Sequence, residues 1–439
     1  MTPLRKMIDI RCAVRRVILA FCLALAALPA AAAIYRGAVI DADTGAPIAG
    51  AVVTLGAVTA ATDAAGTFLI EGEGNWVAFR ALGFGRAAVR TAAIGEAGVR
   101  VPLKPIEPRA LYLSFWGIGS RALREPALAL ADAGHVNALV VDVKGDRAML
   151  PYPSAIPLAA GIGARKVTTV KDLPGLVAAL HARGVYAIAR IVVFKDDLLA
   201  RARPEWAVRR AGGGQWRDRE GLGWVDPFRR EVWDYNIAVA QEAAAAGFDE
   251  IQFDYIRFPD ARGLAFSQEN VEEARVAAIS GFLDEARRRL VPYNVFLSAD
   301  IFGYVCWNTN DTEIGQRLED LAGRVDYLAP MLYPSGFHLG IPGYRNPVAK
   351  PAPIIERTLE RARERTGLPP SRFRPWLQAF RDYAFDRREF GREEIQAQIR
   401  AADAFGANGW MLWNPRNVYR GEDLRPEEPA LQAASAGQP

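Results

Sequence analysis

Apolar runs of strand length alternate with helical stretches through residues 110–420. Eight such runs occur, and stretches with helical periodicity lie between them, a rhythm that predicts a parallel sheet covered by helices. Eight units over this length belong to the α/β class and predict a (β/α)8 TIM barrel. An open, doubly wound sheet is the alternative, but no Gly-rich phosphate turn follows an early run. The eight runs are residues 110–116, 138–143, 185–194, 250–258, 295–302, 325–333, 374–380 and 409–413.

Residues 34–104 follow a different pattern, in which short strands are separated by polar turns. The tripeptide Asp43, Thr44 and Gly45 supplies the turn between two strands, and residues 62–70 repeat the order of turn and strand. Turns at this spacing predict a small all-β sandwich at the N-terminal side of the barrel. The segment resembles the carboxypeptidase regulatory-like domain, and that resemblance implies an accessory module to which we assign no chemistry.

The remaining segments are short and have distinct compositions. Residues 1–33 combine a basic start, an apolar stretch at 17–28 and a run of alanines, which predicts a cleaved signal peptide and an exported protein, either periplasmic or secreted. The apolar stretch is short for a membrane anchor, so we expect no stable membrane insertion after cleavage. Residues 105–109 predict a Pro-rich linker, and residues 421–439 predict a loose C-terminal tail.

The charge balance changes once the predicted signal peptide is set aside. Residues 1–33 hold five of the 54 Lys and Arg and one of the 50 Asp and Glu, so the rest of the chain is electrically balanced. A balanced chain gives no indication of a nucleic-acid partner. Cys306 is the single cysteine left, which excludes an intrachain disulfide. The three histidines have no metal-binding spacing, so we predict no metal site and no cofactor.

Three aspartates are predicted at the C-terminal ends of barrel strands, where TIM-barrel active sites lie. Alternation along the strands turns Asp142, Asp254 and Asp300 toward the barrel interior. The same alternation places Lys144 on the face of Asp142, and Ser298 on the face of Asp300. A barrel interior with a purely structural role would carry Val, Ile or Leu at these positions, so the acids indicate a site.

Paired carboxylates are the groups that glycosidic bond cleavage requires. One must be protonated to donate to the leaving oxygen, and the other must be ionised to attack the sugar or to activate water. Arg257 follows Asp254 closely and would keep it ionised, although a plain ion pair between the two is the alternative. Predicted rim residues would orient the sugar. The substrate-binding candidates are Asp142, Lys144, Arg257, Trp307, Tyr333, Gln378, Trp413 and Asn414.

Several segments together resemble the bacterial putative glycosyl hydrolase domain family. The strongest is Asp249-Glu-Ile-Gln-Phe-Asp-Tyr-Ile-Arg-Phe-Pro, and the resemblance spans about residues 109–420. It implies a TIM barrel acting on carbohydrate. We would expect an acid after Leu-Gln in the seventh run, but Ala379 stands there, so no seventh-strand acid enters the mechanism. The other matching segments begin at Val140, Trp224, Ser298, Ile314, Val325, Arg374 and Gly409.

These observations lead to one main hypothesis and two rivals. The main one is an exported glycoside hydrolase acting on a polysaccharide or envelope glycan, with Asp254 as nucleophile or electrostatic stabiliser and Asp300 as acid/base. The first rival is a glycan-binding or envelope-assembly barrel without hydrolysis. The second is a hydrolase that uses the three aspartates to hold Mg²⁺ or Ca²⁺. The sequence leaves the sugar, the linkage, the stereochemistry and the oligomeric state open.

Overall fold

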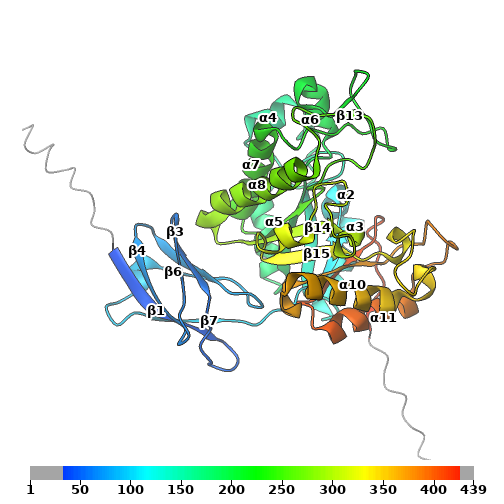
Figure 1. The fold of residues 1–439 in the computed structure, drawn as a ribbon. Helices are drawn as coiled ribbons and strands as arrows, with labels where there is room; N and C mark the ends of the chain where they lie inside the picture. Colours follow the sequence, from blue (N-terminus) through cyan, green and yellow to red (C-terminus); the bar gives the residue numbers. More distant parts are fainter. Residues whose placement is uncertain (1–32, 426–439) are drawn as a thin grey trace, which may run out of the picture.

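Eight of the strands from β8 to β17 form a closed barrel with helices around it (Figure 1), in a computed structural model that describes residues 33–425. The strand order is β10-β12-β14-β15-β16-β17-β8-β9, and all eight neighbouring pairs are parallel. The predicted (β/α)8 barrel is therefore confirmed. The barrel strands are β8 (Arg109–Leu113), β9 (Ala138–Lys144), β10 (Tyr186–Val192), β12 (Glu250–Asp254), β14 (Phe296–Phe302), β15 (Tyr327–Met331), β16 (Trp376–Gln378) and β17 (Trp410–Trp413).

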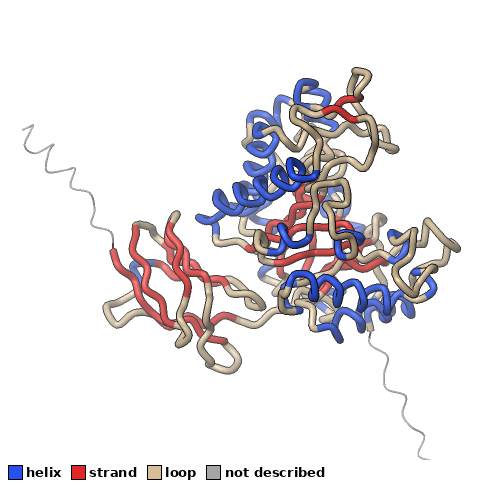
Figure 2. The backbone as a smooth tube through the Cα atoms, viewed as in Figure 1, coloured by secondary structure: helices blue, strands red, loops and turns tan. Residues whose placement is uncertain are grey.

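Helices lie outside the strands, as Figure 2 shows. Their buried side chains and the outward side chains of the strands form one apolar layer, to which β14 contributes Leu297, Ala299 and Ile301. This is the alternation predicted for that strand. The helices are α2 (Phe115–Gly119), α3 (Arg121–Asp132), α4 (Pro157–Gly161), α5 (Leu173–His181), α6 (Asp197–Ala202), α7 (Arg230–Ala245), α8 (Glu272–Leu290), α9 (Leu318–Ala322), α10 (Pro351–Thr366), α11 (Arg392–Phe405) and α12 (Gly421–Leu424). The loops also carry a two-stranded sheet of β11 (Arg209–Arg210) and β13 (Leu264–Ala265).

The barrel interior is filled by large side chains rather than left hollow. Tyr112, Phe296, Tyr327 and Trp376 are all buried there, together with small and branched residues such as Val140. TIM-barrel interiors are packed in this way, in layers contributed by alternate strands. The packing supports the polar residues that stand at both ends of the barrel.

Strand β9 departs from the predicted alternation at its end. Its pairing with β10 runs from Arg190 opposite Asp142 directly to Ile191 opposite Lys144, so one residue is bulged out of the ladder. A β-bulge of this kind turns the following side chain to a different face. The prediction that Asp142 and Lys144 share the interior face is therefore wrong, because Lys144 points into the helix layer.

The N-terminal part consists of two sheets that pack against each other. Strands β1 (Ala33–Asp41), β4 (Thr67–Gly72) and β7 (Val99–Leu103) form the first sheet. The second contains β2 (Val52–Leu55), β3 (Val58–Ala61), β5 (Trp76–Arg80) and β6 (Ala87–Arg90). Val39, Phe68, Val53 and Phe79 belong to one core drawn from both sheets. The two layers agree with the predicted sandwich.

The sandwich contacts the end of the barrel where the strands begin. Arg86 donates hydrogen bonds to the carbonyl oxygens of Gly247 and Phe248 and to Asp249, at 2.8–3.3 Å, just before β12. Arg80 donates to the carbonyl oxygen of Val295, just before β14. The opposite end of the barrel, where the strands finish, is left free of this module.

Two predicted segments fall largely outside the described residues. The predicted signal peptide lies outside them except for Ala33, and the predicted tail is described only to residue 425. The described beginning of that tail is helix α12 rather than a loose segment. Within residues 33–425 no helix is both long and apolar enough to cross a membrane.

Candidate active site

Arg190 stands at the centre of the C-terminal end of the barrel. It comes from β10 and is 1% exposed. Its guanidinium donates to Asp142 at 2.6 Å, to Asp146 at 2.9 Å, and to Asp254 at 2.6 and 2.9 Å. One cation is therefore shared among three carboxylates. Such a cluster holds the guanidinium rigidly, because loss of Arg190 would leave buried carboxylates without a cation.

Asp254 ends strand β12 and accepts hydrogen bonds on both carboxylate oxygens. Oδ2 accepts from Arg190, and Oδ1 accepts from the backbone N–H of Tyr255 at 2.6 Å. Tyr255 has φ of 51°, a left-handed conformation that non-glycine residues rarely adopt. This turn brings the amide back onto the carboxylate. Strained backbone held by its surroundings is concentrated at functional sites.

Asp300 lies on the neighbouring strand, β14. Phe253 pairs with Ala299 across the two strands, so Asp254 and Asp300 occupy the next positions along the ladder. Trp376 donates its indole N–H to Asp300 Oδ1 at 2.7 Å. Burial and the nearby Asp254 charge raise the pKa of Asp300 well above its usual value, although Arg190 and Trp376 oppose this. Asp300 is therefore harder to ionise than an ordinary aspartate, whereas Asp254 is bonded directly to a cation.

A cavity of about 410 Å³ opens above these acids. Asp254, Asp300 and Arg190 line it, and aromatic side chains including Tyr333 and Trp413 form its walls. Burial and the charges of Asp300 and Asp254 raise the pKa of Tyr333 well above its usual value. The Tyr333 hydroxyl therefore stays protonated and can donate a hydrogen bond to a bound molecule.

Two more predicted residues lie at this cavity. Trp413 stacks on Tyr112 with ring centres 3.9 Å apart, and the Arg190 guanidinium lies 4.8 Å from the Trp413 ring. Arg257 also lines the cavity, where it packs on the rings of Trp224 and Tyr255. It forms no ion pair with Asp254 among the described residues, because Arg190 occupies that place. The predicted neighbour that binds Asp254 is thus replaced by an arginine from another strand.

Asp142 and Lys144 do not line the cavity. Asp142 accepts from Arg190 on one oxygen, and from the Tyr112 hydroxyl and the Phe115 amide on the other. It therefore holds Arg190 in place. The Lys144 ammonium is fully buried in the helix layer, 2.7 Å from Asp196 and 2.8 Å from the Val192 carbonyl oxygen. Its predicted contact with substrate is wrong, because the bulge in β9 turns it away from the barrel interior.

Three other substrate-binding candidates also lie away from the catalytic cavity. Gln378 is buried and uses its amide on Ser335 and the Phe380 carbonyl oxygen. Trp307 lines a separate surface hollow and donates to Thr358. Asn414 borders a neighbouring cavity and spends its amide on backbone carbonyls. Their side chains are committed to holding loops, which residue type alone does not reveal.

Within the described residues, no group of three His, Cys, Asp or Glu side chains is arranged to hold a metal ion. The three aspartates considered for Mg²⁺ or Ca²⁺ do not converge on one point. Arg190 lies between Asp142 and Asp254, where it supplies the positive charge that a cation would bring. Asp300 faces Trp376 instead.

The most important residue missing from the predicted set is Arg190. It was visible as the one charged residue within the apolar run 185–194, and a buried charge of this kind demands partners. Asp146 and Trp376 were also missed. Asp146 lies beyond the end of its strand, and Trp376 is an aromatic residue that could equally have been plain core.

A parallel barrel with two acids on adjacent strand ends is the architecture of TIM-barrel glycoside hydrolases. Residues 110–419 match the family described as "Putative glycosyl hydrolase domain", and the chain belongs to that family. The family membership supports a hydrolase in general. No curated protein matches the chain.

Solved structures with related folds include both close and distant sequences. A hypothetical protein from Ruminiclostridium thermocellum ATCC 27405 is 40% identical over 43% of this chain and 96% of its own, with a TM-score of 0.39. The PgaB (BpsB) glycoside hydrolase domain from Bordetella bronchiseptica is 15% identical over 71% of this chain and 95% of its own, with a TM-score of 0.53. A class V chitinase from Pseudomonas fluorescens Pf-5 is 14% identical over 72% and 97%, with a TM-score of 0.43. At 15% identity, the PgaB likeness supports the barrel fold alone.

Proposed function

We propose that the barrel hydrolyses glycosidic bonds in a polysaccharide or envelope glycan, through Asp254 and Asp300. The observation that carries this proposal is the contrast between the two acids on adjacent strands. Asp254 receives two hydrogen bonds from a guanidinium, while Asp300 is buried beside the Asp254 charge. Environments that separate two acids in this way assign one to each half of the reaction.

Asp300 acts as the general acid in this proposal. Its raised pKa favours the protonated form, and Trp376 donates to Oδ1, so Oδ2 can present the proton to the leaving oxygen. Asp254, held by the Arg190 guanidinium, stabilises the positive charge that develops on the sugar, or attacks it as a nucleophile. Tyr333 donates a hydrogen bond to the sugar, and Trp413 forms an apolar wall against it.

We infer a double-displacement reaction with retained configuration, because Asp254 and Asp300 stand at the ends of neighbouring strands. Adjacent strands lie about 4.8 Å apart, and retaining enzymes place their carboxyl groups about 5–5.5 Å apart. Inverting enzymes need about 6.5–9.5 Å to accommodate a water molecule. Proton NMR of the first product anomer tests this assignment, and appearance of the opposite anomer would overturn it.

A glycan-binding barrel without hydrolysis is the second candidate. It is favoured by one observation, that both oxygens of Asp254 are already hydrogen-bonded and so are less free to attack. Binding of a glycan without release of product, indifferent to Asp300→Asn, would support this candidate over the first.

The protein is proposed to act outside the cytoplasm, periplasmic or secreted, on the basis of residues 1–33 alone. The N-terminal module is proposed to be a carboxypeptidase regulatory-like domain with an accessory role. Fractionation of cells that produce the full chain tests the location, and a mature protein beginning near residue 34 is the expected result.

The direct test of the function is Asp254→Asn assayed against a panel of polysaccharides and aryl glycosides. The wild-type protein is expected to release reducing ends from at least one of them, and the variant is expected to fail on the same substrate. Circular dichroism establishes that the variant is folded. Unchanged turnover in a folded variant would overturn the proposal.

A further inference from the structure

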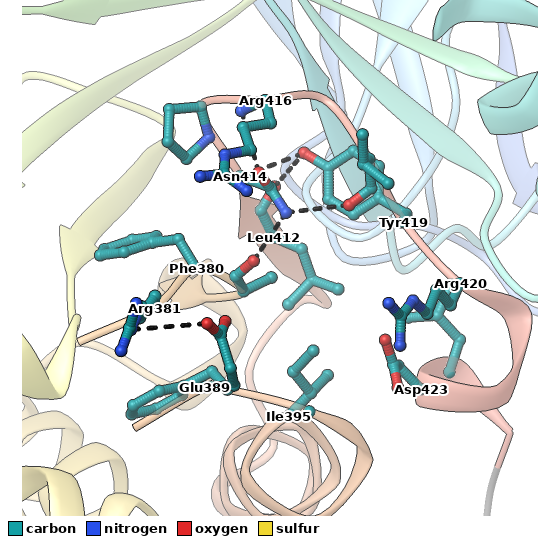
Figure 3. A pocket seen from close by; sticks show the side chains of 16 residues that line it. Phe380, Arg381, Glu389, Ile395, Leu412, Asn414, Arg416, Tyr419, Arg420 and Asp423 are labelled. Carbon is teal, nitrogen blue, oxygen red and sulfur yellow. Dashed lines mark hydrogen bonds and ion pairs between the residues drawn. The ribbon is translucent and has the colours of Figure 1, made fainter. Parts of the chain in front are cut away.

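A second cavity lies beside the catalytic cavity (Figure 3). It has a volume of about 600 Å³ and lies at the C-terminal ends of β16 and β17, against helices α11 and α12. Phe380 and Pro415 line both cavities, so the two abut along these side chains. The roles proposed above for Asp254 and Asp300 use no side chain of this second cavity.

The second cavity has an apolar floor and a charged rim. Figure 3 shows Leu412 and Ile395 facing each other across it, with charged side chains on both sides. Arg416 and Arg420 are exposed at the rim. Apolar surface combined with a few polar groups is typical of sites for small polar molecules, and sugar rings also present both kinds of face.

One wall of this cavity is held by Asn414. Its side-chain amide donates to the carbonyl oxygens of Ala379 at 2.8 Å and Val418 at 2.9 Å, and its Oδ1 accepts from the Arg416 amide at 2.9 Å. These bonds tie the loop after β17 to the end of β16. The wall is therefore formed before any ligand arrives, which reduces the ordering entropy that binding must overcome.

The opposite wall is built around Asp382. Its carboxylate accepts hydrogen bonds from the Ser335 hydroxyl and from four consecutive backbone amides, those of residues 384–387, at 2.6–3.1 Å. This loop carries Phe380 and Arg381 into the cavity. An acid does follow the seventh strand after all, but its carboxylate organises a loop rather than reaching the reacting bond.

Aromatic rings form a continuous surface out of the catalytic cavity toward this loop. Tyr333 meets Phe380 edge to face with ring centres 5.5 Å apart, and Phe380 lies parallel to Tyr383 at 6.2 Å. Tyr383 is 54% exposed, which is unusual for so large a ring. Exposed rings beside a polar cleft offer flat surfaces to the C–H faces of sugars.

We propose that the two cavities form one groove for a glycan chain, with the units on one side of the cleaved bond seated in the second cavity. This inference rests on the proposed function and specifies its substrate as a chain that extends over Phe380 and Pro415, not a terminal monosaccharide. Arg416 and Arg420 bind the hydroxyl or acidic groups of the distal units.

The test compares affinities along ladders of oligosaccharides. The probes are oligomers of glucose, N-acetylglucosamine, galactosamine and galacturonic acid, each from two to six units. Calorimetry is performed on the full chain carrying Asp300→Asn, with and without Arg416→Ala and Arg420→Ala. Both arginines are exposed, so these substitutions leave the core intact. The matched control removes Arg361 and Arg363 on α10, of which Arg361 is half-buried and Arg363 is exposed.

The expected result is an affinity that rises with length in at least one ladder. The double substitution should lower the affinity for the longest oligomers about tenfold, while leaving that for dimers within about twofold. The control substitutions should change neither. Equal losses at every length, no loss, or no length-dependent binding to any ladder would overturn the inference. Failure of the wild-type protein to hydrolyse any of the ladders would count against the proposed function alone, because the affinities still decide whether the groove binds a chain.

Discussion

Strand β12 carries a buried acid at each end, and the two acids lie in opposite circumstances. At its start, Glu250 accepts from Arg374 at 2.6 Å, and Arg374 spends its other donors on Asn408. At its end, Asp254 shares Arg190 with two further aspartates. The cluster around Arg374, here called the lower cluster, pairs one arginine with one acid. The cluster around Arg190, here called the upper cluster, has more carboxylates than cations and opens into a cavity.

The comparison shows that similar buried ion pairs can have different roles in the two clusters. The balanced pair of Glu250 and Arg374 links β12 to the segment before β16, although Glu250 Oε1 has no hydrogen-bond partner. Carboxylates gathered around one guanidinium disfavour one another's ionisation, and burial together with the Asp254 charge raises the pKa of Asp300. The two ends of the barrel differ in the number of acids per arginine more than in the burial of those acids.

The largest expected effect is seen when the acid at each end of strand β12 is replaced by its amide and the two variants are compared. Asp254→Asn should lower kcat by on the order of a thousandfold, because the charge that stabilises the transition state is lost. Its effect on stability should be small, since Arg190 keeps Asp142 and Asp146 as partners. Steady-state kinetics and thermal unfolding measure the two quantities.

The matched control is Glu250→Gln, the same exchange of acid for amide four residues earlier on the same face. It should lower the free energy of unfolding by about 3 kcal/mol, because Arg374 loses its acidic partner. Any remaining folded enzyme should keep nearly normal kcat. If both substitutions changed the same quantity, the distinction between the two ends of the barrel would be lost.

Asp300→Asn tests the assignment of Asp300 as the general acid. It should lower kcat by about a hundredfold or more for ordinary glycosides, because asparagine cannot donate the proton. Aryl glycosides with acidic leaving groups need less protonation and should lose less. An equal loss for both leaving groups would indicate that Asp300 is not the general acid.

The raised pKa of Asp300 also predicts the direction of two pH effects. Activity that needs the protonated acid should fall as the pH rises through this raised pKa. Asp300→Asn should remove this fall from the pH–activity profile. The folded protein retains the proton to a higher pH than the unfolded chain does. The free energy of unfolding should therefore decrease as pH rises between the two pKa values, and this decrease should be absent in the variant. Kinetics and melting curves across acidic and neutral pH measure both.

The smallest expected effect comes from Tyr383, an exposed residue at the edge of the cavity. Tyr383→Ala should raise KM a few-fold, corresponding to about 1 kcal/mol of lost stacking, and should leave kcat and stability almost unchanged. Tyr383→Phe is the control, because it keeps the ring. A fall in kcat with unchanged KM would show that this edge does more than bind.

The barrel could be predicted from sequence because each strand is a distinct apolar run, and a period of two then assigns Asp254 and Asp300 to the interior. The partners of these acids could not be predicted in the same way. Arg257 is near Asp254 in sequence, but the structure selects Arg190 from the adjacent strand. Lys144 was misplaced because a bulge depends on how two strands pair, and no property of one strand reveals it. Gln378 and Asn414 both hold loops, and this role could not be predicted because an amide that holds a loop looks the same in sequence as one that binds sugar.

The contact of Arg86 with the carbonyl oxygens of Gly247 and Phe248 has an evolutionary consequence. Main-chain oxygens are present whatever side chains the barrel carries, so much of this docking site persists while the barrel sequence diverges. At these main-chain contacts the two modules can accumulate substitutions with little mutual constraint, whereas pairs such as Arg80 with Asp326 and Thr54 with Asn294 still couple their side chains. A fused partner could in the same way be exchanged for another that presents an arginine at this point, without redesign of the catalytic half.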